Sequence, residues 1–190
     1  MRWPGKDKAP DLQPVPHYYI LEVDRGETEK ITSDLPVLNL LPLKITSRYR
    51  DVKLVFRLGN ESYQSEPNHQ FITSPEDILT QQVKNWLEKS GLFSKVMVGG
   101  KGGSGFTLET AVTAFYGVAR PNLSPAAVLE MQFFLTDLSK SSEGALFEYG
   151  LRVSAEVTKS TPAETVIGWR QALMKTLIGL ELNLSDYFQK

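Results

Sequence analysis

Residues 74–93 read SPEDILTQQVKNWLEKSGLF and contain the clearest helix signals in the chain. Ser74 is a good N-cap, and Pro75 suits the first helical position because the N–H that proline lacks has no partner there. Gly91 tolerates the left-handed backbone that ends a helix. The apolar residues between them recur at steps of three and four and share one face: Ile78, Leu79, Val83, Trp86 and Leu87. Strand-like segments flank this stretch, so we expect a crossover helix packed on a sheet.

The composition limits the classes of protein that the chain can form. Its 190 residues, 41% of them hydrophobic, are enough for one well-buried core, and we expect a single domain over residues 17–190. The formal net charge of −1 gives no overall attraction for nucleic acid, so we expect no nucleic-acid partner. The absence of cysteine excludes disulfides, thiol nucleophiles and thiolate metal sites. No apolar run reaches the roughly 18 to 20 residues that span a bilayer.

Residues 1–16, MRWPGKDKAPDLQPVP, are rich in proline and lack a periodic apolar pattern. Such a segment resists both helix and sheet, so we expect a flexible, extended leader. Two interpretations of the leader stay open. It is either a linker that holds the domain away from an anchor or a frayed terminus.

Three segments before the residue 74–93 helix are typical of β-structure. Residues 17–23, HYYILEV, combine aromatic and β-branched side chains and should form the first strand. Residues 36–46 are apolar and extended, but Pro42 cannot donate a ladder hydrogen bond, which indicates an edge strand or a bulge. Residues 52–58 alternate apolar and polar side chains, and the Gly-Asn turn after them lets residues 62–65 return as the second strand of a hairpin.

A short strand over residues 95–98 is expected after the helix. Hairpin, helix and strand together suggest a βαβ crossover, which should be right-handed if its strands are parallel. Residues 99–105, GGKGGSG, are interpreted as a flexible loop. A phosphate-binding loop needs its lysine after the last glycine and a helix directly behind it, whereas Lys101 lies among the glycines and a strand follows.

Residues 106–118, 128–138 and 146–157 each alternate apolar and polar side chains. Alternation over such lengths predicts an antiparallel meander with one buried face. A capping box at residues 161–164, TPAE, should begin a closing helix that covers this face with an apolar stripe including Trp169. In the first strand, the residues assigned to the buried face are Phe106, Leu108, Val112, Ala114, Tyr116 and Val118.

Together these elements predict an α/β fold that borders on α+β. The sheet should be mixed but largely antiparallel, because the longest predicted strands form the meander. The two main helices should pack on one face of this sheet, which gives the two layers that a domain of this size needs.

Groups suited to catalysis or metal binding are scarce in the sequence. The two histidines, His17 and His69, lie 52 positions apart and form no compact metal-binding pattern. No G-x-S-x-G nucleophile motif occurs, and the carboxylates of the strands are interpreted as part of a solvated polar face. We therefore expect no catalytic residues, no metal and no cofactor, and a protein that is not an enzyme.

A cluster of basic residues between positions 44 and 57 is the strongest candidate for a binding surface. Arginine beside an aromatic ring suits a phosphate or a carboxylate, whether it belongs to a lipid or to an acidic protein. Two plainer interpretations stay open: the charges form an ordinary outer face of the hairpin, and the aromatic residues belong to the core or to a protein interface. The candidate partner-binding residues are Tyr49, Arg50, Arg57, Tyr63 and Phe71.

The order of these segments resembles a known family. The matching stretches are YYILEV, then LPLKITSRYRDVKLVFRLGNESYQSEPNHQFITSPEDILTQQVKNWLEKSGLF, then AVTAFYGV, AAVLEMQFFL and the final amphipathic helix. The most specific part is the arginine-bearing hairpin, the NHQF segment at 68–71 and the SPEDIL helix start. This arrangement is similar to the PqiC-like ABC-type transport auxiliary lipoprotein family, and the resemblance covers nearly the whole chain after the leader.

The resemblance implies a fold related to the N-terminal domain of TolB and to anticodon-binding domains. It also implies a nonenzymatic auxiliary role in the Gram-negative envelope, beside an ABC transporter and an MCE-domain substrate-binding protein that move lipids or hydrophobic solutes. The expected location is the periplasm, with membrane attachment through an N-terminal lipid, although this sequence has no lipobox cysteine. A homo-oligomer and a directly bound lipid are further candidates. The alternative function is a carrier that itself holds a lipid or another hydrophobic ligand.

Overall fold

Strand β7, Phe106–Val118, is the strand to which most of the sheet is attached. In this computed structural model, residues 14–27, 35–100, 105–139 and 144–189 are described, so most of the expected leader and residues 101–104 of the glycine-rich loop lie outside the described residues. The other elements are β1 His17–Tyr19, β2 Leu38–Leu40, β3 Lys44–Ile45, the 3-10 helix η1 Ser47–Tyr49, β4 Lys53–Arg57, β5 Tyr63–Phe71, α1 Pro75–Ser90, β6 Val96–Val98, β8 Ala126–Asp137, β9 Phe147–Glu156 and α2 Pro162–Phe188.

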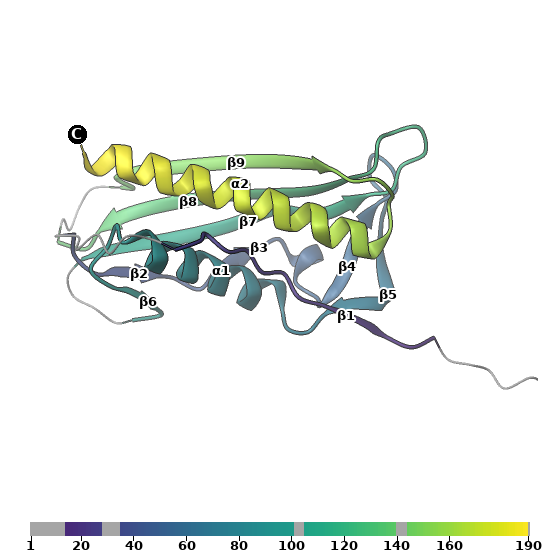
Figure 1. Cartoon of the computed structure of the whole chain (residues 1–190), viewed down its shortest axis with the longest axis horizontal. Helices are drawn as coiled ribbons and strands as arrows, with labels where there is room; N and C mark the ends of the chain where they lie inside the picture. The colour runs from purple at the N-terminus through teal and green to yellow at the C-terminus, as the bar shows by residue number, and fades with distance from the viewer. Residues whose placement is uncertain (1–13, 28–34, 101–104, 140–143, 190) are drawn as a thin grey trace, which may run out of the picture.

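The two edges of β7 are paired in different ways. Along one edge it is antiparallel to β8, which in turn is antiparallel to β9. Along the other edge it meets β2, β3 and β4 in succession, all parallel, and the sheet continues from β4 to β5 and β1 and from β2 to β6. Figure 1 shows both helices on one side of this sheet, with α2 running along β8 and β9. The predicted mixed, largely antiparallel sheet with two helices on one face is therefore confirmed.

The two helices begin and end as the sequence predicts. Ser74 caps α1, since its side chain accepts a hydrogen bond from the N–H of Asp77 at 3.1 Å, and Gly91 ends the helix with φ 66°. Thr161 caps α2 in the same way, through the N–H of Glu164 at 3.4 Å. None of the described helices is both long enough and apolar enough to cross a membrane.

Two strands in the first half differ from the prediction. The first strand stops at Tyr19 instead of continuing to residue 23, because the chain turns towards α1, where the N–H of Val23 donates to Gln82 Oε1 at 2.9 Å. Pro42 divides the predicted residue 36–46 strand into β2 and β3. β2 is not an edge strand, since it lies between β6 and β7.

The hairpin of β4 and β5 is confirmed, but its second strand is longer than predicted. The predicted βαβ crossover is wrong. Helix α1 joins β5 directly to β6. Strand β5 is antiparallel to β4, whereas β4, β7, β2 and β6 are successively parallel, so β5 and β6 run in opposite directions.

A bulge in β7 changes which of its side chains are covered by the helices. The register with β8 shifts between Val112 and Ala114, so Thr113 is the extra residue. Residues before the bulge follow the predicted alternation, with Leu108 and Val112 in the core. Beyond it the faces exchange, because one inserted residue reverses the side-chain period of two. Ala114, Tyr116 and Val118 therefore lie on the face away from the helices, which corrects the sequence assignment.

Trp169 of α2 lies at the centre of the helix-facing core. Its side chain is fully buried, its ring centroid is 4.4 Å from that of Phe115 and 5.8 Å from that of Phe71, and its indole N–H donates to the carbonyl of Val128 at 3.1 Å. Gly168 beside it lets the helix approach the sheet closely. The indole thus joins α2 to three strands at once.

Trp169→Ala should lower the free energy of unfolding by about 3 to 5 kcal/mol, because it removes a fully buried aromatic ring and leaves a cavity. Trp86→Ala, at 4% exposure on α1, should cost a similar amount. Urea denaturation monitored by circular dichroism measures both. Ile167→Ala, at a 45% exposed position of α2, is the control. A loss below about 1 kcal/mol for either tryptophan would contradict this packing.

Candidate functional site

The sheet face turned away from the helices carries a compact group of tyrosine and arginine side chains. The chain between β3 and β4 folds over this face as η1 and buries Tyr49, whose exposed fraction is 3%. Tyr63 comes from the start of β5, and Tyr116 comes from β7 just beyond the bulge. We call this group the outer-face cluster and define it by six residues: Arg48, Tyr49, Arg57, Tyr63, Tyr116 and Arg152.

The three tyrosine rings of the cluster contact one another. The ring of Tyr63 lies edge-on to both others, with centroids 6.4 Å from Tyr49 and 5.7 Å from Tyr116. Tyr49 and Tyr116 are stacked at 6.1 Å. Both edge-on and stacked geometries are favourable for aromatic pairs, so the rings form a rigid support for the arginines.

Two arginines converge on the hydroxyl of Tyr116. Arg57 Nη1 donates to Tyr116 Oη at 3.2 Å, and Arg152 Nη2 donates to the same oxygen at 2.7 Å. Arg57 also donates to the carbonyls of Gly59 and Asn60, which fixes its guanidinium at the hairpin turn. The hydrogen bond to Tyr116 raises the pKa of Arg57, so this cation persists under all ordinary conditions.

Arg48 is exposed and rests on the faces of two tyrosine rings. Its guanidinium carbon lies 5.0 Å from the ring centroid of Tyr63 and 5.7 Å from that of Tyr49, which is cation–π geometry. Within the described residues neither Arg48 nor Arg57 makes an ion pair, whereas Arg152 pairs with Glu130. The cluster therefore has two positive charges that no carboxylate of the described ranges neutralises.

The predicted site residues divide into two groups. Tyr49, Arg57 and Tyr63 are brought together in the cluster. Arg50 points elsewhere and pairs with Glu76 near the start of α1 at 3.2 Å. Phe71 is a core residue, since it is 2% exposed and stacks on Phe115 at 5.7 Å.

Sequence reasoning missed Tyr116 and Arg152 as members of the site. Both belong to strands far along the chain from the basic segment, and Tyr116 reaches the outer face only because of the bulge. The alternating pattern of its strand predicted that Arg152 points to the polar face. No feature of the sequence indicated that this position lies close to the hairpin.

The two histidines are in contact despite their separation in sequence. Parallel pairing of β1 with β5 places His17 opposite His69, with ring centroids at 4.9 Å, and Tyr19 Oη is 2.9 Å from His69 Nδ1. Among the residues that the structure describes, no three histidine or carboxylate side chains are grouped to hold a metal ion.

Comparison with known proteins relates this chain to others by fold. No family model matches it, and no curated protein matches its sequence. Protein XCC0632 from Xanthomonas campestris, a crystal structure assigned to the family model DUF330, is similar with a TM-score of 0.75, 16% identity, and coverage of 92% of this chain and 100% of that one.

Two further solved structures have a similar arrangement. One is an uncharacterized protein, with a TM-score of 0.68, 15% identity and coverage of 88% of this chain and 97% of that one. The other is the hypothetical protein CT253 from Chlamydia trachomatis, with a TM-score of 0.50, 9% identity and coverage of 79% and 98%. At these identities the likeness shows a shared fold.

The geometry of the outer-face cluster is suited to binding an anionic group. Arginine presents several N–H donors in one plane, and a carboxylate or phosphate accepts two of them at once. Tyr49 and Tyr116 are buried and Tyr63 is half-buried, and these rings hold the cations in place before any ligand arrives, which lowers the entropy lost on binding. The surface therefore combines positive charge with rigid aromatic area, as protein interfaces often do.

Tyr49→Phe should make the protein less sensitive to alkaline pH. Burial, with a smaller effect from Tyr63, raises the pKa of Tyr49, while an unfolded tyrosine releases its proton near about pH 10. Above that pH the unfolded state binds fewer protons than the folded state, so the free energy of unfolding falls as pH rises, by at most about 1.4 kcal/mol per pH unit for one group.

Urea denaturation of wild type and Tyr49→Phe at a series of alkaline pH values measures this slope. Tyr18→Phe, at a 60% exposed position, is the control. Equal slopes in wild type and Tyr49→Phe would show that Tyr49 does not carry the effect.

Proposed function

We propose that this protein is a nonenzymatic auxiliary component of an envelope transport system for lipids or hydrophobic solutes, and that it acts through protein–protein contacts. Its partners in this proposal are an MCE-domain substrate-binding protein and its ABC transporter. The proposed location is the periplasmic side of a membrane, to which an N-terminal lipid attaches the protein.

The observation that carries the proposal is the outer-face cluster, in which Arg48 and Arg57 have no carboxylate partner among the described residues. Arginine and tyrosine packed together in this way are typical of interface positions that contribute strongly to binding. The family resemblance of the arginine-bearing hairpin supplies the transport context, because that hairpin provides Arg57 and Tyr63. The cluster is thus the surface that we assign to the partner.

A second candidate function is a carrier for a hydrophobic ligand, which needs an apolar pocket. The cavity beneath α1 beside Leu43 and Val83 measures about 10 Å³, which is far below the volume of a ligand site. An open groove of about 330 Å³ lies instead between residues 19–22 and the start of α1, where Ile20 and Ile72 are exposed. Its volume reaches the lower range of ligand sites, and this groove is the observation that favours a carrier.

Cross-linked pull-down from Gram-negative envelopes with the tagged protein as bait tests the proposal. Recovery of an MCE-domain protein without stoichiometric lipid supports the auxiliary function. One lipid per chain without that partner would instead support the carrier.

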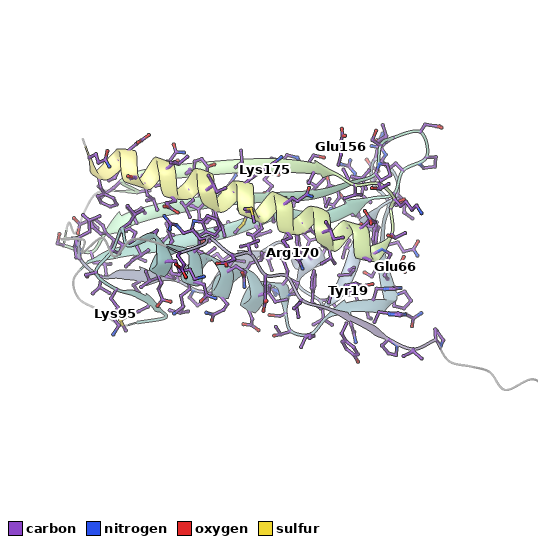
Figure 2. All side chains as sticks on the ribbon, in the orientation of Figure 1. Tyr19, Glu66, Lys95, Glu156, Arg170 and Lys175 are labelled. Carbon is purple, nitrogen blue, oxygen red and sulfur yellow. The ribbon has the colours of Figure 1, made fainter. Side chains whose placement is uncertain are left out.

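Arg48→Glu should reduce recovery of the protein partner about tenfold, because it reverses the exposed charge and removes two cation–π contacts. Thermal stability should fall only by the loss of these exposed contacts, since Arg48 makes no ion pair with the described residues. Arg170→Glu is the matched control on α2, on the other face of the sheet, where Figure 2 shows its position. Equal recovery with Arg48→Glu and Arg170→Glu would remove the cluster from the proposed interface.

A further inference from the structure

Strand β9 forms a long free edge of the sheet. It pairs with β8 over ten positions, from Phe147 opposite Leu135 to Glu156 opposite Ala126. Across the described ranges, which omit residues 1–13, 28–34, 101–104, 140–143 and 190, no strand pairs with its other side. Figure 1 shows β9 along the upper border of the sheet, beside α2. A strand of this length at an edge is a template for pairing with another strand.

The hydrogen-bonding groups along this edge alternate in direction. The N–H of Val157 donates to the carbonyl of Pro125 at 3.0 Å, so residue 157 is a position that bonds towards β8. In an antiparallel ladder every second residue bonds to the same neighbour. The even-numbered residues from 148 to 156 therefore direct their N–H and C=O groups outwards, away from β8.

The apolar layer on the helix-facing side is also incomplete at this edge. On β8, Leu129, Met131 and Phe133 are fully buried. Their partners on β9 are Val153, Leu151 and Tyr149, and these are only half-buried although they face the same side. An additional strand would cover their exposed flank.

We propose that the edge is covered by a second copy of this chain, with β9 paired antiparallel to β9 about a two-fold axis at Gly150. This register places Glu148 opposite Arg152 of the second copy, and the symmetry repeats the pair. Opposite charges in directly facing positions stabilise a strand pair. In this register the even-numbered residues of one β9, whose N–H and C=O groups point outwards, lie opposite the even-numbered residues of the other β9. These groups can therefore form a complete ladder of hydrogen bonds.

Shifting the axis to residue 152 is unfavourable. That register places Arg152 opposite Arg152 and Glu148 opposite Glu156, and like charges in facing positions destabilise the pair. An axis at residue 154 pairs Arg152 with Glu156 but leaves Glu148 beyond the paired strands. The axis at Gly150 pairs seven residues from each copy, 147 to 153, and makes two opposite-charge pairs.

Arg152 can serve this contact without leaving the outer-face cluster. Its Nη1 donates to Glu130 and its Nη2 to Tyr116, and a guanidinium has five N–H donors. The remaining donors are available to Glu148 of the second copy. The proposed dimer therefore keeps both outer-face clusters intact and on the same side of one continuous sheet.

A single introduced cysteine tests the register directly, because these 190 residues contain none. In Gly150→Cys the two Cα atoms at the axis would be about 5.5 Å apart, within the range that a disulfide spans. Under mild oxidation this variant should form a covalent dimer. Ser154→Cys is the control, since its two copies would lie roughly 26 Å apart in this register. Equal cross-linking of the two variants, or none in Gly150→Cys, would overturn the proposal.

Charge reversal provides an independent measurement by sedimentation over a concentration series. Glu148→Lys should weaken dimerisation about tenfold or more, because it sets two like-charge pairs in place of two opposite-charge pairs. Glu156→Lys is the matched control on the same strand and face, outside the paired residues, and Figure 2 shows its position near the end of β9. A wild-type protein that stays monomeric, or greater sensitivity to Glu156→Lys than to Glu148→Lys, would refute this interface.

Discussion

The hydrogen bonding of β7 along both edges is the constraint on which the rest of the structure depends. One edge holds β8 over its whole length, and the other holds three short strands in succession. Because those strands come from residues 38–57, the N-terminal half of the chain can complete its sheet only after β7 has formed. The hairpin that carries Arg57 and Tyr63 is fixed to the sheet through only two residue pairs of β4 with β7, Phe56 with Gly117 and Arg57 with Val118.

On the helix side, Glu181 connects three segments that are distant in sequence. Its carboxylate accepts hydrogen bonds from both Nε and Nη2 of Arg25, and from the indole N–H of Trp86 at 2.8 Å. The first loop, α1 and α2 therefore meet at one partly buried carboxylate. Each donor compensates some of the hydration that the carboxylate loses, so the contact mainly fixes how the two helices are placed.

The sequence was informative wherever local pattern and tertiary packing agree. Helix caps at Ser74 and Thr161, the hairpin and the alternating β8 and β9 were predictable, because each depends on neighbours within a few residues. The bulge at Thr113 was not, since it depends on pairing with β8, and neither was the contact of Tyr116 with Arg57. The sequence therefore predicted only the site residues of the hairpin and the segment before it. Tyr116 on β7 and Arg152 on β9 had no local sequence signal.

The bulge at Thr113 also affects how this protein tolerates changes in chain length. Removing one residue there would restore a regular strand and exchange the faces of the residues on one side of position 113. Tyr116 would then turn into the helix-facing core and Phe115 out of it, although every other residue of the chain was unchanged. Substitutions along β7 alter one side chain each, whereas a one-residue deletion would dismantle both the aromatic core around Trp169 and the outer-face cluster.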